Sequence, residues 1–136
     1  MSSEILWPEP RIRKMRGLCY QFSCSHYYWN PDWTELKNKE EFGLCALKNG
    51  HGHNYQLEVL LPEDSDWIRA KSVLQKLVES LDHQNLNLLP HFEKVIPTTE
   101  AIAEWLSKEI VRQLQVPELQ LTLKESESLW VRLKLP

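Results

Sequence analysis

Two histidines separated by a single residue, His51 and His53, carry the first chemical signal in the sequence. They lead into residues 56–61, where apolar and polar side chains alternate in the way typical of a β-strand. Residues two apart on a strand point to the same face, so the two imidazoles project side by side. A catalytic zinc site has three protein ligands and one open position, and imidazole is a preferred ligand. Paired histidines also occur as ordinary polar surface, so a third ligand has to be found.

A third imidazole is offered by His26, at the end of a second alternating segment over residues 18–26. By period two, His26 shares the apolar face of Tyr20 and Phe22, a position that equally fits a hydrogen-bonded core histidine. If this strand pairs antiparallel with the strand that begins at His51, the end of the first lies beside the start of the second. His26 then meets the paired imidazoles, and the three together are predicted to bind zinc.

Other groups able to do acid–base chemistry are Cys45, the Asp82-His83 pair and Glu125. Asp82-His83 follows a predicted helix, where a histidine is favoured by the helix dipole, so the pair also fits a plain helix end. Glu125 continues the apolar face that ends at Leu123, and burying its carboxylate is costly without a partner. From the alternation alone, we expect Glu125 to emerge into water at the strand end.

These residues lie in motifs that resemble the 6-pyruvoyl-tetrahydropterin synthase family and its relatives, the 6-carboxytetrahydropterin synthases. The resemblance covers roughly residues 17–135, nearly the whole chain. In chain order the motifs are Phe22-Ser23-x-Ser25-His26, Phe42-Gly43-x-Cys45, Asn49-Gly50-His51-Gly52-His53-Asn54-Tyr55, Leu81-Asp82-His83-Gln84-Asn85-Leu86-Asn87, Pro97-Thr98-Thr99-Glu100 and the lone Glu125.

The resemblance implies a zinc-dependent lyase that converts 7,8-dihydroneopterin triphosphate into 6-pyruvoyl-tetrahydropterin with loss of triphosphate. It implies that the three histidines hold Zn²⁺ and that Cys45 removes a proton from the substrate side chain. Asp82 and His83 would form the proton-transfer pair, since a carboxylate fixes the histidine tautomer. Glu125 would grip the amino-pyrimidinone edge of the pterin, whose two N–H donors suit a carboxylate, together with Thr98 and Thr99.

Two alternatives stay open. The related enzymes cleave the side chain and give 6-carboxytetrahydropterin, the product used in queuosine biosynthesis. The long spacing from His26 to Cys45 and from Cys45 to His51 leans slightly towards the pyruvoyl product. A non-catalytic pterin- or purine-binding module is the second alternative, and the retained Cys45 speaks against it because a mere binder has no use for the thiol.

The elements that must position these groups follow in the order ββααββ. A helix is predicted after an N-cap at Asp64 or Ser65, and a second helix is predicted from near Thr98 or Thr99 to Val116-Pro117. Alternating residues 119–124 and 129–135 then predict a β-hairpin. We expect an α+β domain over residues 17–136, a four-stranded antiparallel sheet covered on one face by two helices. The resemblance implies the tunnelling fold (T-fold), in which trimers close their sheets into a barrel and two trimers stack into a homo-hexamer.

Two segments carry no motif. Residues 1–16 contain Pro8, Pro10 and a basic cluster, and we expect an extended arm with a solvated surface rather than a triphosphate site. Residues 27–41 are unusually aromatic, and we expect a short helix or a mobile loop whose rings pack beneath it, with a pocket rim or a contact with a partner subunit as the alternatives. His91 matches no motif and is expected at the surface.

The composition excludes several functional classes. A chain of 136 residues is the length of one domain, and its formal net charge of −3 argues against binding nucleic acid. Three cysteines without a pairing pattern suggest a reducing compartment. No signal-peptide run follows Met1 and no segment has the apolar length of a membrane span, so we expect a cytoplasmic protein without membrane partners.

Overall fold

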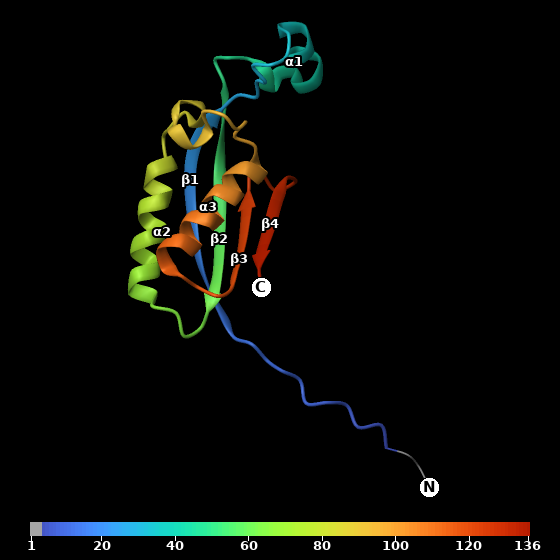
Figure 1. Cartoon of the computed structure of the whole chain (residues 1–136), viewed down its shortest axis with the longest axis vertical. Coiled ribbons are helices and arrows are strands. Elements are labelled where there is room, and N and C mark those ends of the chain that lie inside the picture. The colour runs from blue at the N-terminus through green and yellow to red at the C-terminus, as the bar shows by residue number, and fades with distance from the viewer. Residues whose placement is uncertain (1–3) are drawn as a thin grey trace.

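The computed structural model describes residues 4–136 and contains one antiparallel sheet with two long helices on one face (Figure 1). Its strands lie side by side in the order in which they occur in the chain. They are β1 (Met15–His26), β2 (His51–Pro62), β3 (Leu119–Lys124) and β4 (Trp130–Leu135). The covering helices are α2 (Trp67–Leu81) and α3 (Thr99–Leu114), which confirms the predicted ββααββ arrangement.

Alternation along the strands separates a covered face from an open one. Phe22, Tyr55, Leu57 and Val59 point towards the helices and are buried, while their polar neighbours face away. The helices contribute Leu74, Leu81, Ile102 and Leu106 to the same core, all without solvent exposure. Each such side chain stabilises the fold by about 1.5–3 kcal/mol relative to an exposed one. The sheet is therefore a rigid base for any group at its ends.

The register of β1 against β2 decides where the histidines lie. His26 is paired directly with His51, and Cys24 is paired with His53. The end of one strand therefore meets the start of the other, and the three imidazoles come from adjacent positions on the same end of the sheet. This is the antiparallel pairing that the sequence pattern predicted.

The helix starts differ in part from the sequence prediction. Helix α2 is capped by Asp66, whose side chain accepts a hydrogen bond from the amide of Arg69. The prediction of Asp64 or Ser65 as the cap is wrong, because the Ser65 hydroxyl instead donates to the Pro62 carbonyl and closes the preceding turn. Helix α3 begins as predicted, with the Thr98 hydroxyl accepting from the amide of Ala101.

The segment between His26 and β2 folds into helix α1 (Glu35–Phe42) and the 3₁₀ turn η1 (Gly43–Ala46). Buried Asn38 holds the helix to the preceding loop through hydrogen bonds with Asn30. Trp33 stacks on Phe42 with ring centroids 5.5 Å apart, so these two rings pack together, whereas Tyr27 and Trp29 line an open pocket. Two further 3₁₀ turns, η2 (Leu86–Leu88) and η3 (Pro90–Phe92), connect α2 to α3.

Residues 4–14 form an extended arm that leaves the sheet at the end opposite the histidines (Figure 1). Every residue of this arm is exposed. No helix within residues 4–136 combines the length and the apolar character needed to cross a membrane.

Candidate active site

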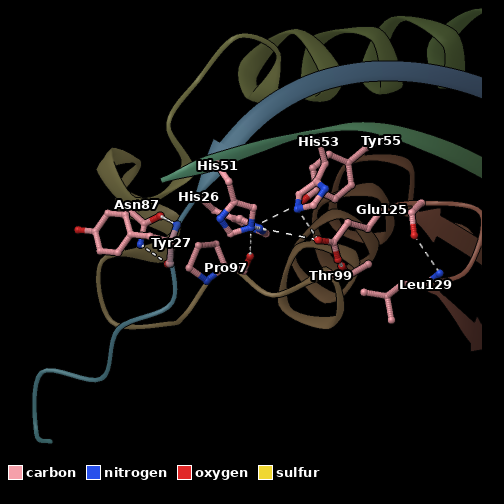
Figure 2. A network of polar contacts seen from close by, with 11 residues as sticks. His26, Tyr27, His51, His53, Tyr55, Asn87, Pro97, Thr99, Glu125 and Leu129 are labelled. Atoms are coloured by element: carbon pink, nitrogen blue, oxygen red, sulfur yellow. Dashed lines mark hydrogen bonds and ion pairs between the residues drawn. The ribbon is translucent and has the colours of Figure 1, made fainter. Parts of the chain in front are cut away.

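Three imidazoles and one carboxylate converge where β1 ends and β2 begins (Figure 2). The Nε2 atoms of His26 and His51 are 3.0 Å apart. One ligand atom from each of His26, His51, His53 and Glu125 lies within 4.8 Å of every other. Three imidazole nitrogens with one open side match the ligand number and type of a zinc centre.

His26 is held in one orientation from behind. Its Nδ1–H donates to the Pro97 carbonyl at 2.8 Å, and the Tyr55 hydroxyl lies 3.4 Å from the same nitrogen. This contact fixes the tautomer and directs the lone pair of Nε2 at the cluster, as carbonyl contacts do for histidines that bind metals. Burial lowers the pKa of His26 to about 4, although the Pro97 carbonyl opposes the shift. His26 is therefore neutral at pH 7, the state that a metal ligand requires.

His53 supplies the observation that tests the fit of a metal ion. Its Nε2 is buried and has no aligned hydrogen-bond partner within residues 4–136, although Glu125 Oε1 lies 2.5 Å away. Burial lowers the pKa of His53, while the charge of Glu125 raises it. A buried nitrogen without an aligned hydrogen-bond partner, within 4.8 Å of two further imidazole nitrogens, fits a zinc ion.

Glu125 belongs to this cluster, contrary to the expectation from strand alternation. It follows β3 directly, and its side chain is only 8% exposed. The Thr99 hydroxyl donates to Oε2 at 2.6 Å, and Oε1 faces His53. The expectation that Glu125 enters water is wrong, because α3 delivers a donor to the carboxylate.

The two threonines of the Pro97-Thr98-Thr99 motif have different tasks. Thr99 is buried and contacts Glu125. The Thr98 hydroxyl caps α3 and makes no recorded contact with the cluster within the described residues.

The turn that carries Cys45 is connected to the cluster by Tyr28, a residue that was not among the site residues predicted from the sequence. The Tyr28 amide donates to the Cys45 carbonyl at 2.6 Å, which fastens η1 to the chain just beyond His26. The Tyr28 ring lies edge-on to His26 with centroids 5.1 Å apart. Burial raises the pKa of Tyr28 to about 12, and the charges of Glu125 and Cys45 add to the shift. Tyr28 lies beyond the alternating part of β1, so no periodic signal identified it.

Asp82 and His83 lie apart from the cluster, at the free edge of β1. Asp82 Oδ1 accepts from the amide of Ser23 at 2.9 Å, while the His83 amide donates to the Ser23 carbonyl at 2.6 Å. Asp82 Oδ2 is 2.9 Å from His83 Nδ1. The Ser23 amide and His83 lower the pKa of Asp82. The His83 side chain is 84% exposed, and within residues 4–136 no recorded contact joins it to the three histidines.

His83 takes a backbone conformation that is uncommon outside glycine, with φ of 60°. It lines an open hollow of about 510 Å³ together with Ser25, Asn54 and Asn85. His91 is at the surface, as expected, and its ring stacks on Trp105.

Known proteins that are similar to this chain identify its family. Residues 19–135 match the family described as 6-pyruvoyl tetrahydropterin synthase. The human 6-pyruvoyl tetrahydrobiopterin synthase is 30% identical over 105 residues, which cover 70% of this chain and 72% of the human protein. The Drosophila melanogaster protein of the same name is 32% identical over 117 residues, 79% of this chain and 70% of its own.

Two further relatives complete the comparison. Dihydroneopterin monophosphate aldolase of Pyrococcus furiosus is 31% identical over 121 residues, which cover 83% of this chain and 90% of that protein. The solved Caenorhabditis elegans 6-pyruvoyl tetrahydropterin synthase superposes with a TM-score of 0.81 at 23% identity, covering 91% of this chain and 99% of that one. The chain therefore belongs to the 6-pyruvoyl tetrahydropterin synthase family and is a lyase-type enzyme of the tetrahydropterin synthase kind.

Proposed function

We propose that this protein is a zinc-dependent synthase that converts 7,8-dihydroneopterin triphosphate into 6-pyruvoyl-tetrahydropterin and triphosphate. The observation that carries the proposal is the cluster of three imidazoles next to a buried carboxylate. The similarity of most of the chain to 6-pyruvoyl tetrahydrobiopterin synthases also supports the proposal.

His26, His51 and His53 would hold the zinc ion, with Pro97 orienting His26 from behind. When bound, zinc supplies Lewis acidity towards the side-chain hydroxyls of the pterin. The carboxylate of Glu125, steadied by Thr99, accepts the two N–H groups of the amino-pyrimidinone edge.

Cys45 is the proposed base that removes the carbon-bound proton of the substrate side chain. Its turn is fixed to Tyr28, and Tyr28 packs on His26, so the thiol is carried by the same framework as the metal ligands. Asp82 holds His83 through Nδ1 and leaves Nε2 free to exchange a proton with the substrate.

We further propose that three copies of the chain form a ring and that the active enzyme is most simply two such trimers stacked together. Each pocket then lies at a boundary between copies. Two observations support this. Within residues 4–136 the outer edge of strand β4 is unpaired, and exposed edges are normally covered. His83 is exposed at the free edge of β1, where a second copy can cover it and share it in a pocket.

Complementation tests the shared pocket. Cys45→Ala and His83→Ala chains are purified separately, mixed under conditions that exchange subunits, and assayed. Mixed rings contain pockets with both wild-type groups, so activity should return well above the sum of the two inactive samples. Light scattering monitors the assembly, and an active monomer, or mixed rings without activity, would contradict the proposal.

The identity of the product is the decisive test of the chemistry. Zinc-loaded protein is incubated with 7,8-dihydroneopterin triphosphate, and the products are identified by mass spectrometry. Equal amounts of triphosphate and 6-pyruvoyl-tetrahydropterin are expected. Acetaldehyde with 6-carboxytetrahydropterin would move the assignment to the carboxy-forming branch. Binding without turnover would favour a non-catalytic pterin module.

Cleavage of a phosphorylated dihydroneopterin is the second candidate function. The Pyrococcus furiosus dihydroneopterin monophosphate aldolase matches this chain as closely as the synthases do, and over a larger share of its length. Parallel incubation with 7,8-dihydroneopterin monophosphate separates the two candidates. Faster consumption of the monophosphate, with release of a two-carbon aldehyde, would replace the proposed reaction.

A further inference from the structure

An apolar groove lies between α3 and β4, at the end of the domain opposite the histidines. Its floor is aliphatic, built from Val111, Leu119, Leu133 and Leu135, and its volume is about 390 Å³. Lys108, Arg112 and Lys134 line its rim. The groove borders the unpaired outer edge of β4, so within residues 4–136 no element covers it. None of the groove residues belongs to the proposed catalytic machinery.

The N-terminal arm has the opposite character. Between Glu4 and Glu9 it presents Ile5, Leu6 and Trp7, whose side chains are 76%, 87% and 83% exposed. Consecutive large apolar side chains in water are unfavourable, and a contiguous exposed group of this kind marks a contact surface. Pro8 and Pro10 restrict the backbone to extended conformations, so the arm is stiffened before it binds.

Arm and groove also match in charge. Glu4 and Glu9 flank the apolar residues of the arm, whereas Lys108, Arg112 and Lys134 line the groove. Arg112 forms an ion pair with Glu109, and within residues 4–136 no ion pair occupies Lys108 or Lys134.

The base of the arm is fixed to its own domain, and its tip is not. Lys14 accepts a backbone hydrogen bond from Glu63, and Arg13 forms an ion pair with Glu118 at the start of β3. Beyond these anchors the arm runs away from its own domain (Figure 1), which leaves its exposed apolar residues available to a different molecule. We infer that the segment 4–9 of one copy docks in the α3–β4 groove of a second copy of this chain.

Photo-crosslinking of the full-length protein tests this inference. The photoreactive amino acid p-benzoyl-phenylalanine replaces Trp7, and irradiated protein is separated on a denaturing gel. A band at twice the chain mass is expected, with crosslinked peptides from residues 107–112 and 133–135. The control carries the same probe at Ile68, which is 87% exposed on α2 and outside the groove, and should give several-fold less of this product.

A charge exchange sharpens the test. Lys134→Glu should lower the yield of the Trp7 crosslink about threefold, as expected for an exposed ion pair, and Glu9→Lys in the same chain should restore it. Groove crosslinks that stay at the mass of one chain would show that the arm binds its own groove, which overturns the inference. Crosslinks mapping elsewhere, or a yield no greater than that of the Ile68 control, would overturn it as well.

Discussion

Strand β1 holds two groups of titratable side chains in contrasting ways. Its last residue, His26, points to the covered face and is 1% exposed, between the Pro97 carbonyl and the other imidazoles. Three residues earlier, the backbone of Ser23 at the free edge binds Asp82 and leaves the His83 ring in water. The histidine cluster is complete within one chain, because the sheet register creates it. The Asp82-His83 pair is oriented by the strand backbone and lines an open hollow at the free edge, where it is exposed to a neighbouring molecule.

Removing one ligand from the cluster should have the largest effect. His51→Ala or His53→Ala leaves two imidazoles, which are too few to retain zinc. The metal should therefore be lost, and activity should fall with it by about a thousandfold or more. Purified wild-type protein should hold about one zinc per chain by elemental analysis. His91→Ala, at the surface, is the matched control and should keep both. Full zinc in His51→Ala or His53→Ala would remove that residue from the site.

Cys45→Ala separates chemistry from metal binding. The thiol is carried by η1 and is not part of the cluster, so zinc content and fold should be unchanged while kcat falls about 10²–10⁴-fold through loss of the base. Cys19→Ala, at an exposed position, should retain activity.

Cys24→Ala is the sharper control because Cys24 is close to His26 in sequence. It is buried in the core, and burial raises the pKa of its thiol to about 12, so it is a poor base. Inactivation by Cys24→Ala, with Cys45→Ala active, would show that the base is assigned to the wrong cysteine.

The buried state of His26 should make the metal-free protein sensitive to acid. The pKa of His26 is lowered from 6.5 to about 4, so the unfolded chain takes up a proton in this window while the folded chain does not. Stability is therefore fully present above pH 6.5 and falls as the pH drops towards 4, by up to about 3 kcal/mol from this group.

Urea unfolding of the metal-free protein above pH 6.5 and near pH 4 measures this loss. Because carboxylates titrate in the same range, His26→Gln is unfolded in parallel, and the difference between the two proteins isolates the histidine. An identical pH dependence in both would mean that His26 is protonated in the fold.

The contrast along β1 also explains what the sequence could predict. Alternation over residues 18–26 and 56–61 fixed the faces of β1 and β2, and pairing of His26 with His51 follows once these strands are antiparallel. The prediction that Glu125 enters water was wrong because strand alternation shows which face of the sheet the side chain is on. It does not show that α3 places a hydrogen-bond donor on that face. The contact depends on Thr99, 26 positions earlier in the chain. Tyr28 was missed for a similar reason, since its role depends on a backbone bond to Cys45 across α1.

The two adjacent threonines offer the finest test of which contacts belong to the site. Thr99→Val removes the hydrogen bond to Glu125 while keeping the side-chain shape. Because the buried carboxylate then lacks one donor, the free energy of unfolding should fall by about 1 kcal/mol. We expect KM for the pterin to rise several-fold with stability little changed beyond that cost. Thr98→Val instead removes the cap of α3, which lowers the free energy of unfolding by about 1 kcal/mol and leaves KM unaltered. Steady-state kinetics and urea unfolding of both variants distinguish the two roles. If Thr98→Val raised KM as much as Thr99→Val, the Thr98 hydroxyl would contact the substrate in addition to capping the helix, and the division of tasks between them would be wrong.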